Sequence, residues 1–213
     1  MSTTFDIVPI RRADITFGQV FEKAKQRIQE YLLDIGIYKP IKLEAVIHHQ
    51  KELYVRKALP EDAFFWEQTE YAYFYIEDFP GGTDAYCRLL KDDYPGATWY
   101  MFDSLKENSE GIENLQKKLE MAKSLNRHWC FRRSMGQPAI MTICYGLISG
   151  AVAELTEGII WSDDGGWDYR PVESEAFFGF YFRPDKALNK HNAKWASECI
   201  EAVQSDYGLE WDE

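Results

Sequence analysis

The sequence lacks the short motifs by which many enzymes are recognised. Only four histidines and four cysteines occur in 213 residues, and no CxxC, HExxH or HxxxH spacing is present. The glycine signatures GxSxG, GxGxxG and GxxxxGK[ST] are absent too, so a nucleophile elbow, a dinucleotide fold and a phosphate loop have no support. The four scattered cysteines, at positions 87, 130, 144 and 199, indicate reduced and mostly buried thiols in a cytosolic protein.

A long uninterrupted hydrophobic run is also missing. Residues 1–14 contain no apolar core of the kind found in signal peptides. The longest apolar run, 138–153, is interrupted by two glycines and two hydroxyl residues and is followed at once by Glu154. It is short for a membrane span. We therefore expect a soluble, cytoplasmic protein without a membrane partner.

Basic charge is scarce, since the formal net charge is −11. Segment 61–93 holds nine acidic and two basic residues, 156–185 holds seven and two, and 198–213 holds six acidic residues and no basic one. A nucleic-acid partner is not expected, because it requires a basic footprint. The distribution favours a basic protein as partner. The one basic cluster, six Lys and Arg with a single acid over 116–133, is typical of a solvated helix face.

The hydrophobic periodicity predicts a mixture of helices and strands. Helices are expected over 17–35, 83–90, 109–125 and 138–155 and after a cap at Asp185; strands are expected over 41–47, 53–55, 70–76, 98–102, 128–132 and 158–161, with a possible return strand at 167–169. Segment 173–182 fits either a helix or a strand. Together these elements predict a single α+β domain over 1–213, with a mixed sheet packed against helices.

Helix 138–155 is apolar nearly all round and is expected to be the central core helix. Its glycines, Gly146 and Gly150, lie four residues apart, which predicts a close contact with the sheet. His128 and Cys130, two apart on a strand, would share one face, and a buried pair is favoured over a thiol nucleophile or a zinc ligand.

The stretch "WSDDGGWDY", from Trp161 to Tyr169, crowds three carboxylates around two glycines and between two tryptophans. Asp163, Asp164 and Asp168 carry oxygens suited to Ca²⁺ or Mg²⁺, but their spacing does not fit an EF-hand loop. A tight turn explains the Asp and Gly residues. It does not explain the flanking tryptophans, which favour a loop that binds a partner.

The segment "AVAELTEGIIWSDDGGWDY", residues 151–169, followed by "FFGFYFRP", resembles a family of bacterial immunity proteins. These accompany polymorphic toxins, including effectors of the type VI secretion system. The shared motif falls on Ser162, Asp164, Gly165, Trp167 and Asp168, with a second glycine, at 166, where the family pattern has alanine. The resemblance does not extend clearly into the N-terminal half of the chain.

The resemblance implies a cytoplasmic antitoxin that binds and inhibits one toxin, in many such pairs a nuclease, with no catalysis, cofactor or metal of its own. The candidate toxin-binding residues are Trp161, Asp163, Asp164, Trp167, Asp168, Tyr169, Asp84 and Tyr86. Trp167 could equally cap the core. Two alternatives stay open: a metal-dependent hydrolase that uses Asp163, Asp164 and Asp168, with Glu157 as an optional fourth residue, and a structural adaptor of a secretion or phage apparatus. A homodimer is also left open.

Overall fold

The computed structural model describes residues 3–52, 54–89, 112–162, 167 and 171–207. Eight strands form one sheet in the order β3-β2-β4-β5-β6-β1-β7-β8. The strands are β1 (Thr3–Val8), β2 (Leu43–His49), β3 (Val55–Lys57), β4 (Glu70–Ile76), β5 (Thr83–Arg88), β6 (His128–Arg133), β7 (Ile159–Ser162) and β8 (Val172–Glu173). Every pairing between them is antiparallel, where a mixed sheet was expected. The α+β class itself is confirmed.

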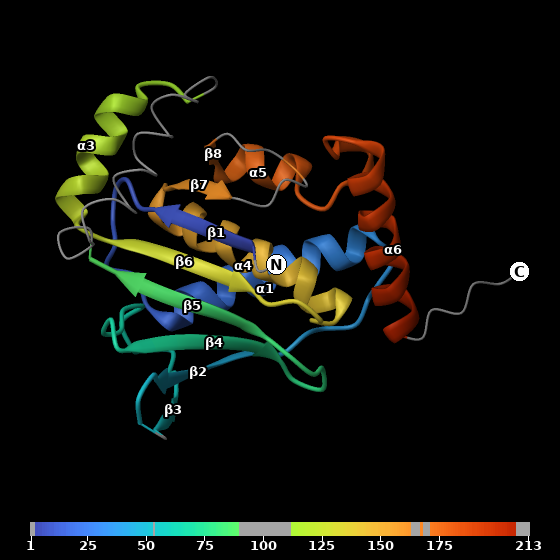
Figure 1. Cartoon of the computed structure of the whole chain (residues 1–213), viewed down its shortest axis with the longest axis horizontal. Helices are drawn as coiled ribbons and strands as arrows, with labels where there is room; N and C mark the ends of the chain where they lie inside the picture. The colour runs from blue at the N-terminus through green and yellow to red at the C-terminus, as the bar shows by residue number, and fades with distance from the viewer. Residues whose placement is uncertain (1–2, 53, 90–111, 163–166, 168–170, 208–213) are drawn as a thin grey trace, which may run out of the picture.

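The helices are α1 (Phe17–Asp34), α3 (Leu115–Leu125), α4 (Ala139–Thr156), α5 (Ser174–Phe180) and α6 (Lys190–Asp206), with a 3-10 turn η1 (Pro184–Lys186) before α6. Helices α1, α4, α5 and α6 pack on one face of this sheet and enclose the main core, and α3 packs on the other face (Figure 1). Helices α1 and α4 lie behind the sheet in the view of Figure 1. Phe17 and Phe21 of α1 contact the ring of Phe74 on β4. The core therefore lies between β4–β6–β1 and the α1–α4 layer.

The predicted central helix is confirmed as α4, which is buried on nearly all sides. Among the described helices, α4 alone is long and apolar enough to cross a membrane. Its burial against α1, α5, α6 and the sheet is that of a core helix, which is consistent with a soluble protein. The two glycines behave differently from the expectation. Gly146 faces the ring of Tyr181, and Gly150 faces Phe177 and Phe178, so they make room for aromatic side chains next to α5 instead of for the sheet.

A helix was expected over 83–90, but residues 83–88 form strand β5. Ala85 and Cys87 point into the core, while Asp84 and Tyr86 alternate with them on the opposite side. A helix would break this alternation, and β5 fills the gap between β4 and β6. The final helix is also capped elsewhere than expected: Asn189, not Asp185, accepts the hydrogen bond of the first turn, at 3.0 Å from the amide of Asn192.

Strand β1 was not expected from the sequence, yet it lies between β6 and β7 near the centre of the sheet. Phe5 and Ile7 point into the core. Asp6 points to the other side, where it is buried and its Oδ1 lies 2.7 Å from Nε2 of His128. Oδ2 of Asp6 also accepts a hydrogen bond from the hydroxyl of Thr4 at 3.1 Å. The pairing with His128 is what allows a carboxylate in a central strand.

The remaining elements agree with the expectations in part. Strand β6, helix α1, strand β4 and strand β7 lie where they were predicted. Segment 173–182, left open, contains the helix α5. The expected strand 98–102, residues 109–111 of the expected helix and most of the return strand 167–169 fall outside the described residues. Helix α3 begins at Leu115, so the described residues 112–114 are not helical, contrary to the expectation. On the side away from β1, the strand that pairs with β7 is β8.

Candidate functional site

The sheet face turned away from α1 and α4 carries a cluster of aromatic side chains. We call it the tyrosine face; it consists of His48, Tyr71, Tyr73, Tyr75 and Tyr86 on strands β2, β4 and β5. All five side chains are half-buried, so each packs on its neighbours and still reaches solvent. The period-two alternation of these strands explains the arrangement, because the residues between them fill the core. In Figure 1, β4 and β5 run in front of the helix layer.

The antiparallel register places three residues of this cluster, His48, Tyr71 and Tyr86, in a row that crosses the sheet. The row consists of Val55, His48, Tyr71, Tyr86, Cys130, Asp6 and Trp161, one residue from each of seven strands. The rings of His48 and Tyr71 stack at 4.9 Å between centroids with an interplanar angle of 7°. The rings of Tyr71 and Tyr86 follow at 5.8 Å. Two of the residues that the sequence proposed for partner binding, Tyr86 and Trp161, therefore belong to one row.

Trp161 lies at one end of the row, and helix α3 covers this end. It is half-buried against a small second core made of Val8, Ile10 and Ile159 with residues of α3. In the described part of the chain, α3 is the helix that packs on this side of the sheet, and it does so at the β1–β7 end. Tyr86 and its aromatic neighbours lie at the other end of the row, away from this second core.

Asp84 lies in the neighbouring row and already has a basic partner within the chain. Its Oδ2 accepts hydrogen bonds from Nε of Arg132 at 3.1 Å and from the terminal nitrogen of the same guanidinium. The Asp84 side chain is 14% exposed, whereas that of Arg132 is 42% exposed. The guanidinium of Arg132 also lies 5.7 Å from the ring of Tyr86. The Asp84 carboxylate is thus paired within the chain, and it holds Arg132 beside the tyrosines.

The local charge of the tyrosine face is balanced among the described residues. Glu44, on the same side of β2, lies 2.6 Å from Lys57 and 3.8 Å from Lys42. Burial, followed by the charge of Asp84, raises the pKa of both Tyr73 and Tyr86. Their phenols stay protonated at neutral pH and can each donate one hydrogen bond. The face can therefore offer ring surface and hydroxyl groups to another molecule.

Trp167 of the acidic loop lies in the core. It is 3% exposed, and its ring packs on Tyr181, Phe182 and Trp195 at centroid distances of 5.7, 5.1 and 6.5 Å. It is therefore not an exposed anchor, and of the two interpretations of this residue the structure supports the core cap. Asp163, Asp164, Asp168 and Tyr169 fall outside the described residues, and their role in partner binding stays a prediction.

Replacing Trp167 by phenylalanine should lower the free energy of unfolding by about 1–2 kcal/mol, because ring volume is lost from a packed site. The loss should stay modest, since the indole nitrogen has no hydrogen-bond partner to lose among the described residues. Thermal or urea denaturation checks the stability. The folded variant should bind a partner as well as the wild type does. Weaker binding without a loss of stability would indicate that Trp167 is part of the interface.

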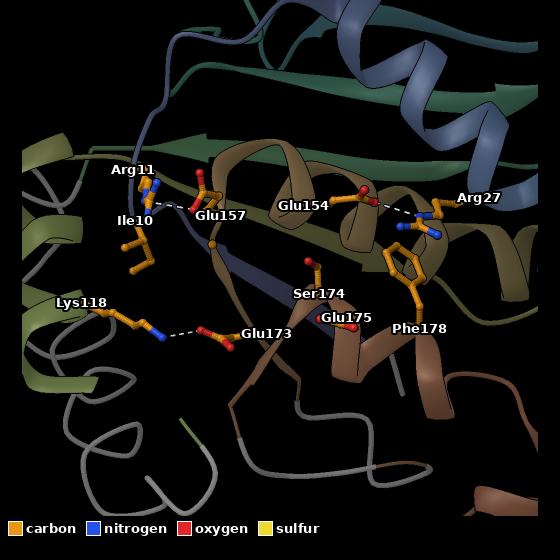
Figure 2. Close-up of a pocket in the computed structure, with 11 residues that line it drawn as sticks. Ile10, Arg11, Arg27, Lys118, Glu154, Glu157, Glu173, Ser174, Glu175 and Phe178 are labelled. Carbon is orange, nitrogen blue, oxygen red and sulfur yellow. Dashed lines mark hydrogen bonds and ion pairs between the residues drawn. The ribbon is translucent and has the colours of Figure 1, made fainter. Parts of the chain in front are cut away.

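A cleft of about 720 Å³ lies apart from the tyrosine face and is lined by internal ion pairs (Figure 2). Arg11 pairs with Glu157 at 2.9 Å, Arg27 pairs with Glu154 at 2.8 Å, and Lys118 of α3 pairs with Glu173 of β8. These pairs join the loop after β1, helix α1 and helix α3 to the C-terminal end of α4 and to β8. We interpret this cleft as a structural charge network. Glu157, named in the hydrolase alternative, belongs to it.

The network predicts a pH-dependent contribution from Glu154. Burial raises the pKa of this carboxyl, but hydrogen bonds from Arg27 and Lys23 outweigh burial and hold it below the usual range. A depressed pKa stabilises the fold above the unfolded-state pKa of about 4.3, and the contribution is lost as the pH falls through the folded-state pKa. Glu154→Gln should therefore be less stable than wild type at about pH 7, and the difference should shrink at about pH 3. Urea denaturation at both pH values checks this; a constant difference would contradict it.

The geometry of the described residues gives little support to a metal site or to a thiol nucleophile. Within the described ranges, no three His, Cys, Asp or Glu side chains come together as a metal site would require. Burial raises the pKa of Cys87 to about 12 and that of Cys199 to about 11, and it raises that of Cys144 as well. These three thiols are therefore poor nucleophiles at neutral pH. The hydrolase alternative rests on three aspartates outside the described residues and stays a prediction.

Comparison of the chain with protein-family models, with curated proteins and with solved structures found no match. The site is therefore argued from its own geometry. Sequence reasoning named Tyr86, Asp84 and Trp161 but missed Tyr71, Tyr73, Tyr75 and His48. The signal for the three missed tyrosines was present in "EYAYFYI", where a tyrosine occupies every second position. Because every residue of this stretch after Glu70 is apolar or aromatic, the stretch was expected to be buried on both sides.

Proposed function

We propose that this chain is a cytoplasmic immunity protein that binds one secreted bacterial toxin and inhibits it, and that the tyrosine face is the binding surface. The observation that supports this most is the row His48–Tyr71–Tyr86, three rings in contact on a rigid sheet. Tyrosine offers large, amphipathic contact area at low cost in side-chain entropy. Aromatic residues of this kind dominate the binding energy of many protein interfaces.

The net charge of −11 supports a basic partner. The tyrosine face itself is balanced in charge, so the acidic character acts at long range by steering the partner toward the protein. A nuclease that acts on phosphate backbones would have the required basic face. In this proposal the tyrosines provide the short-range contacts, and the overall charge raises the association rate.

The proposal is tested by producing the chain together with the toxin domain encoded beside its gene. Cells should survive expression of the toxin, and the two chains should copurify as a complex of defined stoichiometry. Purified protein should abolish the activity of the purified toxin when the two are mixed in equal amounts. If a large excess of the protein leaves the toxin fully active, the proposal fails. A large homo-oligomer in size-exclusion chromatography would favour the structural adaptor instead.

A further inference from the structure

A second cleft, of about 600 Å³, lies where three loop segments meet. They are the loop 11–16 after β1, the loop 61–65 before β4, and the turn between α3 and β6 that carries Arg127. The first two loops are fixed to each other: the amide of Phe64 donates to the carbonyl of Ile15 at 2.8 Å, and the amide of Phe17 donates to the carbonyl of Asp62 at 3.0 Å. The cleft is therefore formed before any ligand arrives, and its volume suits a small molecule.

Arg127 is the unusual side chain of this cleft. Its guanidinium carbon lies 3.9 Å from the centre of the Phe65 ring. Its Nε is buried and has no hydrogen-bond partner in the described part of the structure. The neighbouring arginines differ, since Nε of Arg12 donates to the carbonyl of Leu155 at 2.7 Å and Nε of Arg11 lies 2.9 Å from Glu157. The buried Nε is not itself within reach of a ligand in the cleft. No internal hydrogen bond occupies the terminal nitrogens of the same guanidinium in the described part of the structure, so these nitrogens can donate to an incoming acceptor.

The lining of the cleft selects among anions. Guanidinium groups match carboxylate and phosphate oxygens. The walls are largely apolar, with Ile15 and Phe64 buried and the Phe65 ring 37% exposed. Apolar walls disfavour a strongly hydrated inorganic ion. Three arginines, at positions 11, 12 and 127, line the cleft together with Asp14 and Glu61. The single net positive charge of this lining suits a monoanion better than a dianion.

We propose that this cleft binds a small monocarboxylate that carries an aromatic or apolar group, with the carboxylate on Arg127 and the apolar group on Phe65. The ligand could be a free organic acid or the C-terminal residue of a peptide, since both present the same chemistry. This inference does not depend on the toxin-binding proposal, because the cleft and the tyrosine face are formed by different residues.

The test uses isothermal titration calorimetry of the full chain with phenylacetate, a free acid, and with N-acetylphenylalanine, which mimics a peptide C-terminus. Phenylacetamide and N-acetylphenylalaninamide are the matched uncharged controls, and inorganic phosphate tests for a bare anion site. At least one carboxylate should bind saturably, and its amide should bind at least about tenfold more weakly, the size of one lost charged hydrogen bond. Tighter binding of phenylacetate would identify the free acid as the ligand class, and tighter binding of N-acetylphenylalanine the peptide terminus.

Two variants locate the site. Arg127→Met should weaken carboxylate binding at least about tenfold, while Lys194→Met, which removes a cation from the exposed surface of α6, should leave it unchanged. Phe65→Ala removes an exposed ring and serves if Arg127→Met fails to fold; it should weaken binding of the carboxylate and its amide alike. The proposal is overturned if neither carboxylate binds, if the amides or phosphate bind equally well, or if both variants bind like wild type.

Discussion

Replacing Gly146 by alanine is expected to lower the free energy of unfolding by about 2–4 kcal/mol, although alanine is the better helix former. A Cβ at this position would lie 2.2 Å from the Tyr181 ring. That ring cannot easily move, because it is 1% exposed and its hydroxyl donates to the carbonyls of Thr142 and Ile143 at 3.3 and 3.1 Å. Relieving the clash would break these hydrogen bonds and disturb the aromatic core next to α5.

Gly179 provides the matched control, because it is also a helical glycine, yet a Cβ added there would meet no described atom within 4 Å. Gly179→Ala should be neutral or stabilise the protein by up to about 1 kcal/mol through helix propensity. Urea denaturation of the two variants side by side measures the contrast. Equal effects of the two substitutions would show that Tyr181 does not pack on Gly146 as described.

The double substitution Tyr71→Ala with Tyr86→Ala is expected to weaken toxin binding by about 100-fold or more, which corresponds to about 3 kcal/mol. The two rings are neighbours in the aromatic row, at 5.8 Å, and His48 stacks on the first of them. Removing both leaves a hollow in the middle of the proposed contact surface. Because both side chains are only half-buried and reach solvent, most of the effect should fall on binding and not on folding.

Tyr38 is the control for this experiment, because it is 79% exposed and lies between α1 and β2, outside the tyrosine face. Tyr38→Ala should bind the toxin like wild type. Surface plasmon resonance gives the dissociation rates, where most of the change is expected. Thermal denaturation confirms that the double variant is folded at the temperature of the assay. A folded double variant with unchanged affinity would exclude the tyrosine face as the interface.

Local sequence patterns predicted the elements whose signal is strong and unambiguous. Helix α4 was recognisable because it is apolar on all sides, and β6 because Trp129 and Phe131 alternate with other residues and point inward. Helix α1 carries a complete capping box, with Thr16 and Gln19 each bonded to the backbone of the other. In these elements the local preference and the tertiary environment agree.

Strands β1 and β5 show where local patterns were not sufficient. In β1, Asp6 interrupts an otherwise apolar run, and its partner His128 is 122 positions away. In β5, Thr83 and Asp84 have the composition of a helix cap, but Thr83 donates its hydroxyl proton to the carbonyl of Arg132 and Asp84 binds the Arg132 side chain. Both strands are stabilised by pairing across the sheet. Such partners become visible only when the strand order is known.

The candidate site was predictable residue by residue but not as a surface. Tyr86 and Trp161 were chosen for their aromatic character, and the register of four strands places them in one row. Tyr71, which extends that row, lies on a strand that was expected to be buried on both sides. Asp84 was named as a candidate toxin-binding residue, and its carboxylate pairs with Arg132 of its own chain, 48 positions away. Distances of this kind depend on topology, which periodicity does not specify.

Hydroxyl-radical footprinting of the protein, alone and bound to its toxin, tests the central claim most directly. The side chains of Tyr71, Tyr73 and Tyr86 should lose reactivity in the complex, while Tyr38 should remain as reactive as in the free protein. Met121 on α3 is 37% exposed and reports on the Lys-containing helix. It should also stay reactive. Protection of Met121 with unchanged reactivity of the three tyrosines would contradict the account.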